Sequence, residues 1–163
     1  MSLTIDEGYQ PVCIGRVVQL HATYYAVCSG FGVQFEAKLA REMGDFCNSY
    51  SAARDGLWLA SDSEIQGAIA IDGSGATTEG AHLRWFVTSP ALRGQGLGRQ
   101  LLGRALEFAN ARKYRHTYLW TFDGLHAARH LYESHGFRLL QEGPGTQWGT
   151  EVREQKFVRN LPL

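Results

Sequence analysis

The segment Ser89-Pro-Ala-Leu-Arg-Gly-Gln-Gly-Leu-Gly98 joins a run of strand-forming residues, Ala81 to Val87, to a run with helical spacing that begins near its last glycine. Its alternating glycines let the backbone turn so that several N–H groups point toward one place, at the positive end of a helix dipole. Such a place suits a phosphate group. A plain tight turn between strand and helix would also explain the glycines, which by themselves favour neither interpretation.

Two familiar phosphate-binding motifs do not match this segment. A Walker loop requires Gly-Lys followed by Ser or Thr, and the segment contains no lysine. A dinucleotide-binding fingerprint requires Gly-x-Gly-x-x-Gly, whereas these glycines alternate strictly and an arginine, Arg93, precedes them. Phosphate binding here would therefore use a different motif.

Downstream of the glycine segment, the sequence predicts a helix, a strand, a short helix and two closing strands. The first helix runs to about Arg112 and carries one apolar stripe, formed by Leu97, Leu101, Leu102, Ala105, Phe108 and Ala109. The later elements are a strand at His116–Phe122, a helix at Ala127–His135 ended by Gly136, and strands at Phe137–Glu142 and Glu151–Val158.

Upstream of the same segment, the sequence predicts strands on either side of helical spacing. Val12–Leu20 is rich in β-branched residues and predicts a first strand, followed by an aromatic-bearing loop at His21–Phe31. Phe35–Tyr50 has helical spacing, and Leu57–Ala60 with Ile65–Ile71 predicts an antiparallel hairpin. The fold class that follows is α/β, with a mixed, mostly antiparallel sheet flanked by helices.

Size and charge limit the classes of function. The chain has 163 residues, which suits a single domain spanning residues 1–163. Lys plus Arg and Asp plus Glu both number 16, so the net charge is zero, and we expect neither nucleic acid nor a membrane as a partner. Met1–Gln10 carries acids and no apolar core, which predicts a short ordered or frayed lead-in, no secretory signal and a cytoplasmic protein.

Cysteine and histidine spacing gives no metal site. Cys13, Cys28 and Cys47 are odd in number and widely spaced, which predicts reduced thiols and neither a disulfide framework nor a zinc knuckle. His126 and His130 lie four apart on a predicted helix, but no third ligand completes a known spacing. We therefore expect no metal.

The arginine-led pattern Arg93-x-x-Gly96-x-Gly98 resembles the acetyl-coenzyme A (acetyl-CoA) loop of the GNAT superfamily of N-acetyltransferases. The resemblance extends to Leu83-Arg-Trp-Phe-Val-Thr-Ser-Pro90 and to Ala128-Arg-His-Leu-Tyr-Glu-Ser-His-Gly-Phe137, and so covers about residues 80–137. Leu119–Leu125 and Gln147–Gln155 further resemble the GNAT domain that is fused to MarR-type regulators. At this length the chain has no room for the DNA-binding half, so we expect the domain to stand alone.

The resemblance implies a function and a cofactor site. It implies transfer of an acetyl group from acetyl-CoA to a primary amine of a small molecule or protein, by direct transfer. A catalytically weak acyl-CoA sensor or interaction module is the alternative. Pantetheine would lie along the strand near Phe86 and Val87. The pyrophosphate would be held by the backbone of Arg93, Gly94, Gln95, Gly96, Leu97 and Gly98.

The same resemblance implies catalytic residues. The family's general acid is often a tyrosine in the second conserved block, which here is Tyr132; a packed core tyrosine is the structural alternative. For the general base, Glu79 and His82 are the candidates, and the ordinary pKa of histidine favours His82. A structural histidine bonded to the backbone explains His82 equally well, and a water chain is the alternative to either base. Many members have asparagine seven residues before the tyrosine, whereas this chain has Leu125, which removes that cofactor contact or moves it to a neighbour.

The acceptor site of the family lies after the first strand and in the loop between the closing strands. Those segments are aromatic here, which predicts either a pocket for an apolar or aromatic amine or ordinary core and surface aromatics. The candidate lining residues are His21, Tyr24, Tyr25, Phe31 and Trp148. The resemblance also leaves open a homodimer that pairs through the closing strands.

Overall fold

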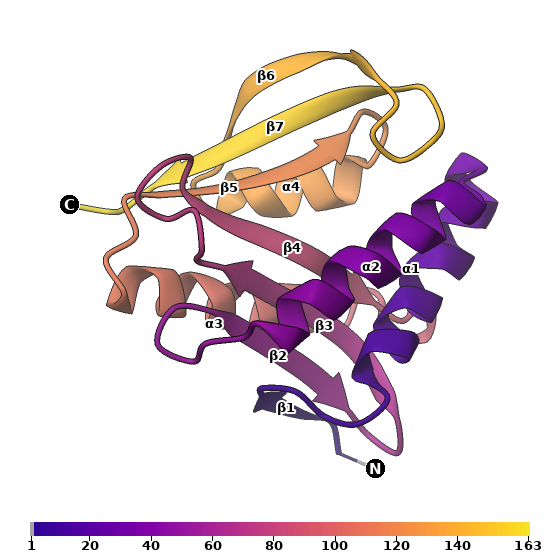
Figure 1. The fold of residues 1–163 in the computed structure, drawn as a ribbon, viewed down its shortest axis with the longest axis horizontal. Coiled ribbons are helices and arrows are strands. Elements are labelled where there is room, and N and C mark those ends of the chain that lie inside the picture. The colour runs from indigo at the N-terminus through magenta and orange to yellow at the C-terminus, as the bar shows by residue number, and fades with distance from the viewer. Residues whose placement is uncertain (1) are drawn as a thin grey trace.

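The computed structural model describes residues 2–163 and places helices on both faces of one twisted sheet (Figure 1). The elements in chain order are β1 (Thr4–Glu7), α1 (Cys13–Ser29), α2 (Val33–Asn48), β2 (Gly56–Ser61), β3 (Ile65–Asp72), β4 (Ala81–Thr88), a 3₁₀ turn (Pro90–Leu92), α3 (Leu97–Ala111), β5 (His116–Phe122), α4 (His126–Ser134), β6 (Arg138–Gly145) and β7 (Val152–Asn160).

The sheet has seven strands in the order β1-β2-β3-β4-β5-β7-β6. Every neighbouring pair is antiparallel except β4 and β5, which run parallel. These two strands pair only where they begin, at Ala81 with Thr117 and His82 with Tyr118. Beyond that point β4 and β5 diverge, which confirms the expected mixed, mostly antiparallel sheet and opens a gap at its centre.

The two faces of the sheet bury two separate clusters of apolar side chains. On one face, α1 and α2 pack over the sheet through residues such as Val17, Phe35 and Met43. On the other face, α3 and α4 pack through residues such as Leu101, Leu102 and Tyr132. The apolar stripe predicted for the helix after the glycine segment is buried in this second cluster, as its spacing requires.

The predicted first strand at Val12–Leu20 is wrong, because those residues form the start of α1. The predicted loop at His21–Phe31 is also mostly helix, since α1 continues to Ser29. The residues that α1 buries include Cys13, Val17, Leu20 and His21, which recur at steps of three and four and so share one helical face. Packing of that face against the sheet outweighs the preference of Val17 and Val18 for strands.

The first strand is β1, in the segment for which the sequence predicts only a lead-in. It pairs antiparallel with β2, from Thr4 opposite Ser61 to Glu7 opposite Trp58. The remaining predicted elements are confirmed with bounds shifted by three residues or fewer. None of the helices in residues 2–163 is both long enough and apolar enough to cross a membrane.

Candidate active site

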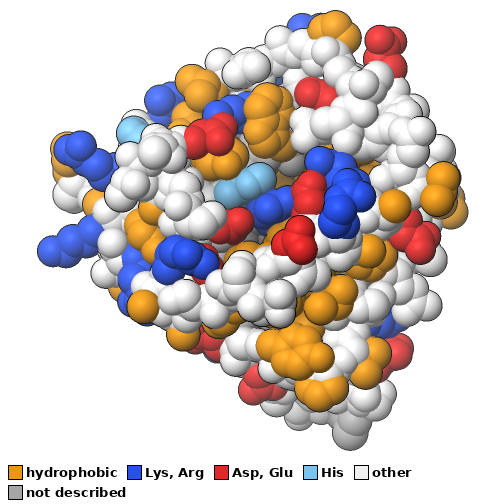
Figure 2. All heavy atoms as spheres, in the orientation of Figure 1, with side chains coloured by type: hydrophobic (Ala, Val, Ile, Leu, Met, Phe, Trp, Pro, Cys, Tyr) orange, Lys and Arg blue, Asp and Glu red, His pale blue; other side chains and the backbone are white. Residues whose placement is uncertain are grey.

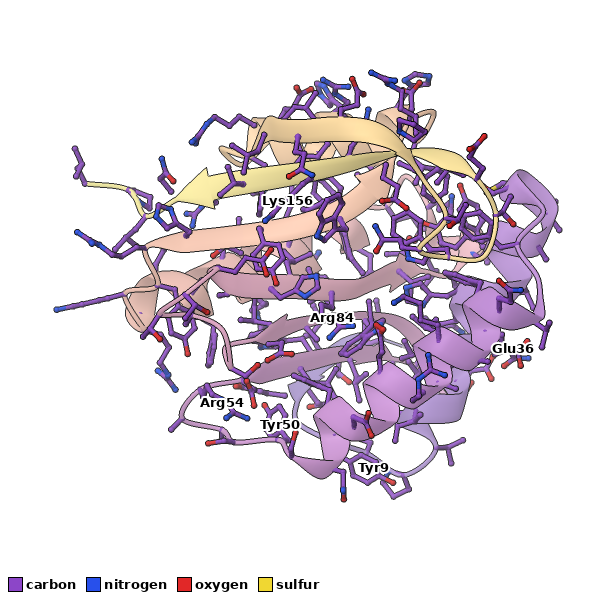
Figure 3. The ribbon with its side chains drawn as sticks, turned by 45° about the horizontal axis from the view of Figure 1, so that its top comes forward. Tyr9, Glu36, Tyr50, Arg54, Arg84 and Lys156 are labelled. Carbon is purple, nitrogen blue, oxygen red and sulfur yellow. The ribbon has the colours of Figure 1, made fainter. Side chains whose placement is uncertain are left out.

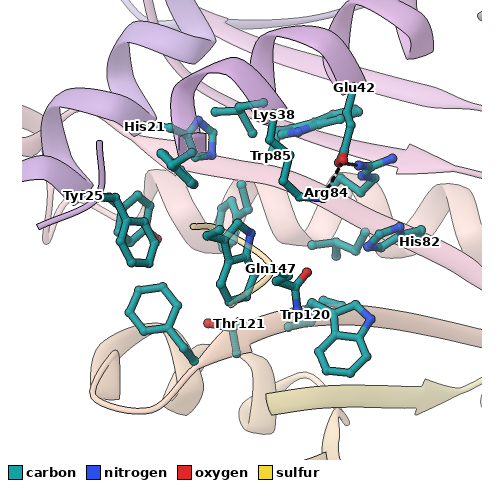
Figure 4. Close-up of a pocket in the computed structure, with 18 of the residues that line it drawn as sticks. His21, Tyr25, Lys38, Glu42, His82, Arg84, Trp85, Trp120, Thr121 and Gln147 are labelled. Carbon is teal, nitrogen blue, oxygen red and sulfur yellow. Dashed lines mark hydrogen bonds and ion pairs between the residues drawn. The ribbon is translucent and has the colours of Figure 1, made fainter. Parts of the chain in front are cut away.

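A cavity of about 400 Å³ lies where β4 and β5 diverge (Figure 4). Its lining comes from α1, α2, β4, β5, α4 and the turn between β6 and β7. The cavity thus brings together segments that are far apart in the sequence. A volume in this range suits a small organic ligand.

A β-bulge in β4 decides which side chains reach this cavity. Opposite β3, Ala70 pairs with Arg84 and Ala68 pairs with Val87, so β4 carries one extra residue between them. Trp85 at this bulge has φ of 50°, a left-handed conformation that is unusual for a bulky residue. Consequently Leu83 packs on the α3–α4 face, whereas Trp85 packs on the α1–α2 face.

One end of the cavity is charged. The carboxylate of Glu42, on α2, is paired with Lys38 Nζ at 2.8 Å and with the guanidinium of Arg84. Arg84 extends from β4 toward α2 (Figure 3), and its other nitrogen lies 3.6 Å from an Asp72 carboxylate oxygen. In the space-filling view, acidic and basic side chains surround a histidine in the hollow near the centre of this face (Figure 2). Sequence reasoning missed this charged group; the i, i+4 spacing of Lys38 and Glu42 was its one signal.

The other end of the cavity is an aromatic wall, which we define as Tyr25, Phe31, Phe35, Phe122 and Trp148. Neighbouring rings in this wall have centroids 5.1–6.3 Å apart, for example 5.1 Å for Phe31 and Phe35 and 6.3 Å for Phe31 and Trp148. These centroid distances lie in the range in which offset-stacked and edge-to-face pairs of aromatic rings attract each other. The wall draws on α1, the α1–α2 connection, α2, β5 and the β6–β7 turn.

The structure brings four of the five predicted acceptor residues to this cavity: His21, Tyr25, Phe31 and Trp148. It does not place the fifth, Tyr24, in the lining. The ring of Tyr24 instead lies under the guanidinium of Arg93, whose Cζ is 4.0 Å from the ring centroid. Tyr24 therefore links α1 to the glycine segment through a cation–π contact.

His21 is buried in the cavity wall, and its tautomer follows from its hydrogen bond. Nδ1 lies 2.9 Å from the carbonyl oxygen of Val17, and because a carbonyl only accepts, Nδ1 must carry the proton. In the neutral ring Nε2 then keeps its lone pair. Burial lowers the pKa of His21 to about 4, so the ring is neutral at pH 7.

The two candidate bases occupy different environments. His82 lines the cavity and stacks on Tyr118 with centroids 4.4 Å apart, and burial, followed by the charge of Arg84, lowers its pKa to about 3. Glu79 is not in the lining; its half-exposed carboxylate accepts a hydrogen bond from Lys156 at 2.6 Å. That bond lowers the pKa of Glu79. Of the two, His82 has the position for proton transfer inside the cavity.

Tyr132, on α4, is 7% exposed and lines the cavity. Its ring packs between Phe86 and Phe137, with centroids 6.1 and 5.9 Å away. Burial, and then the neighbouring Tyr25, raise the pKa of Tyr132, and no hydrogen bond from the described residues offsets the burial. The phenol is therefore protonated at neutral pH and free to donate.

The glycine segment ends as an uncapped helix start. Gly96 is the N-cap of α3 with φ of 81°, no side chain caps the helix, and the first turn holds no acidic residue. Gly94 also has positive φ, at 79°, and a Cβ at either glycine would meet nothing within 4 Å. The positive end of α3 therefore has no side-chain cap and has open space beside its glycines, which fits an anionic group.

The other predicted cofactor residues, Phe86 and Val87, lie on opposite faces of β4. Phe86 lines the cavity and its ring is 3.4 Å from where a Cβ of Gly98 would be, so the glycine lets α3 approach β4 closely. Val87 is buried on the opposite face, among the residues of the α1–α2 cluster. Leu125 is the N-cap of α4 and makes no side-chain hydrogen bond there.

Within residues 2–163, no group of His, Cys, Asp and Glu has the arrangement of a metal site.

A known family and several solved structures match this chain. The family model described as acetyltransferase (GNAT) matches residues 18–137, more than half of the chain. Similar solved structures include the acetyltransferase from Streptococcus agalactiae 2603, at 23% identity and TM-score 0.77 over 98% of each chain. A candidate phosphinothricin N-acetyltransferase has 21% identity and TM-score 0.75, covering 99% of this chain and 100% of that chain.

A third structure was solved with a cofactor. The protein yncA from Salmonella typhimurium, solved with acetyl-CoA, has 16% identity and TM-score 0.71, covering 100% of this chain and 96% of that chain. At such identities the structural similarity shows the shared fold alone. Among curated proteins, none matches the chain in sequence.

Proposed function

Because the chain belongs to the acetyltransferase (GNAT) family, we propose that it transfers an acetyl group from acetyl-CoA to an amine nitrogen. One observation carries the proposal. Tyr132 lines the cavity at the point where β4 and β5 diverge, and its hydroxyl has no hydrogen-bond partner among the described residues. A proton donor in this position suits a reaction that releases a thiolate.

The cofactor side of the proposal rests on the helix start. The backbone N–H groups from Arg93 to Gly98 would bind the pyrophosphate, because they are uncapped and reachable. Acetyl-CoA supplies the acetyl group as an activated thioester. Phe86 contributes an apolar surface at the floor of the cavity. The acetyl-CoA complex of yncA supports this assignment by analogy of fold.

Two residues of this chain handle protons in the proposed reaction. Tyr132 holds a proton on its phenol oxygen and gives it to the leaving sulfur, since its raised pKa keeps it protonated. His82 accepts a proton from the amine, directly or through water, because its lowered pKa keeps the ring neutral. Glu79 is less suited, since its carboxylate is paired with Lys156 outside the lining.

The finer assignments remain part of this proposal. The acceptor is a primary amine of a small molecule or protein, and the protein acts in the cytoplasm as a single domain of residues 1–163. A relationship to GNAT domains fused to MarR-type regulators and pairing into a homodimer stay predictions of the sequence. The outcome of the assay below decides between the enzyme and a weakly catalytic acyl-CoA sensor.

The test combines calorimetric binding of acetyl-CoA with a free-thiol release assay against a panel of amines, amino acids and antibiotics. We expect binding together with acceptor-dependent thiol release. Binding without release across the whole panel would favour the sensor. Absence of binding would refute the proposed function.

A further inference from the structure

The acceptor end of the cavity is built for a flat ring. All five rings of the aromatic wall line the cavity, and Tyr25 among them lies across the cavity from Glu42 and Arg84 (Figure 4). Trp148 lies at the edge of this wall on the β6–β7 turn, with its ring stacked on Phe31 at an interplanar angle of 23°. Aromatic ligands gain most from such surfaces, because offset and edge-on ring contacts add to burial.

The charges in the lining do not suit a cationic ligand. Glu42 is the lining carboxylate, and both of its oxygens are already paired, one with Lys38 and one with Arg84. Asp72, just outside the lining, lies 3.6 Å from the guanidinium of Arg84, so it too is already beside a cation. An ammonium group entering this cavity would lose its hydration and find no carboxylate that is not already paired, which is costly.

The nitrogen bases in the lining point to the same conclusion. His21 and His82 are both held neutral at pH 7, with pKa values lowered to about 4 and about 3. A ring with so low a pKa takes a proton from an alkylammonium poorly, because the alkylamine is much the stronger base. It can still relay a proton from an amine that is uncharged from the start.

We propose, on the premise that the chain is an amine acetyltransferase, that its acceptor is an aromatic amine of the aniline type, whose nitrogen is uncharged at pH 7. The nitrogen lone pair forms a bond to the acetyl carbon, and the carbon–sulfur bond breaks. The nitrogen loses one proton through His82 or water, and Tyr132 gives one proton to sulfur. The products are an acetanilide and free coenzyme A, so the step needs no other reactant.

Three small amines separate charge from aromaticity. Aniline is aromatic and neutral at pH 7, benzylamine is aromatic and cationic, and cyclohexylamine is cationic without an aromatic ring. We expect kcat/KM with aniline to exceed that with benzylamine by at least about tenfold, since burial of an unpaired charge discriminates at that level or above. Cyclohexylamine should be the poorest acceptor of the three.

The outcomes separate this inference from the proposed function. If benzylamine or cyclohexylamine reacts as fast as aniline, the acceptor class is wrong while the acetyltransferase assignment stands. If acetyl-CoA binds and none of the three reacts, the acceptor class is again wrong. If acetyl-CoA does not bind at all, both assignments fail.

A substitution in the aromatic wall gives an independent readout. Trp148→Leu keeps an apolar side chain on the turn but removes the ring, so KM for aniline should rise roughly three- to tenfold, as the loss of one aromatic contact predicts, with kcat little changed. Tyr9→Leu is the matched control, because Tyr9 is exposed and lies outside the cavity lining (Figure 3). An unchanged KM in Trp148→Leu would overturn the aromatic part of the inference.

Discussion

Replacing Tyr132 with phenylalanine deletes the hydroxyl and leaves the ring in place. The contacts of the ring with Phe86 and Phe137 do not involve the hydroxyl, so they persist. The hydroxyl has no hydrogen-bond partner among the described residues, and its loss therefore leaves no group unpaired. We expect the free energy of unfolding to change by less than about 1 kcal/mol, which at this chain length shifts Tm by no more than about 2–4 °C.

The catalytic rate should respond far more strongly than the stability. Loss of a general acid typically lowers kcat by about 100-fold or more, while the affinity for acetyl-CoA should stay near that of the wild type. The assay is free-thiol release under saturating acetyl-CoA, with Tm measured on the same preparations.

Tyr114→Phe is the matched control for this experiment. The hydroxyl of Tyr114 donates to the carbonyl oxygen of Arg54 at 2.6 Å, away from the cavity. Its removal should cost about 1 kcal/mol of stability and leave kcat unchanged, which is the reverse of the Tyr132 pattern. A folded Tyr132→Phe protein that turns over at the wild-type rate would remove Tyr132 from the mechanism.

Three further changes test the rest of the site. Gly96→Glu should abolish acetyl-CoA binding, measured by calorimetry, without unfolding the protein, because it places a negatively charged side chain at the N-cap of α3 beside the anion site. Unaltered affinity would mean that the phosphates bind elsewhere. His82→Ala should remove the acidic limb of the pH profile of kcat/KM, which in the wild type lies well below pH 6.5. Glu79→Gln should retain that limb, and the reverse result would assign the base to Glu79. Burial lowers the pKa of His21 from 6.5 to about 4, so its contribution to stability is present above pH 6.5 and is lost as the pH falls toward 4, by roughly 3 kcal/mol. The free energy of unfolding of His21→Gln, measured by denaturation, should therefore depend less on pH over this range than that of the wild type. An equal dependence would contradict the burial of a neutral His21.

Most of the fold was predictable, because its elements carry strong local signals. The apolar stripe from Leu97 to Ala109, the strand-forming run at Ala81–Val87 and the positive φ at Gly136 all follow from patterns in the sequence. The error at α1 arose because Val17 and Val18 favour strands locally, while the helical face that they share with Leu20 becomes decisive only once the sheet is present to cover it.

The site was only partly predictable, for a different reason. The resemblance pointed to Tyr132 and the glycine segment, and the aromatic residues of the segment His21–Phe31 pointed to Tyr25 and Phe31, which the structure brings to one cavity with Trp148. The pairing of Arg84 with Glu42 depends on tertiary geometry, since the two residues are 42 positions apart and meet only because α2 packs over this face of β4. No local spacing signals such a contact.

The bulge at Trp85 also makes the length of β4 matter as much as its composition. Inserting one apolar residue directly after Trp85, with the bulge kept, would leave the strand equally apolar, yet it would exchange the faces on which Phe86 and Val87 lie. Val87 would then leave the α1–α2 core, and Phe86 would leave the floor beside α3. The second half of β4 should therefore accept many substitutions of one side chain for another but no single insertion, because an insertion would move each following side chain to the opposite face of the sheet.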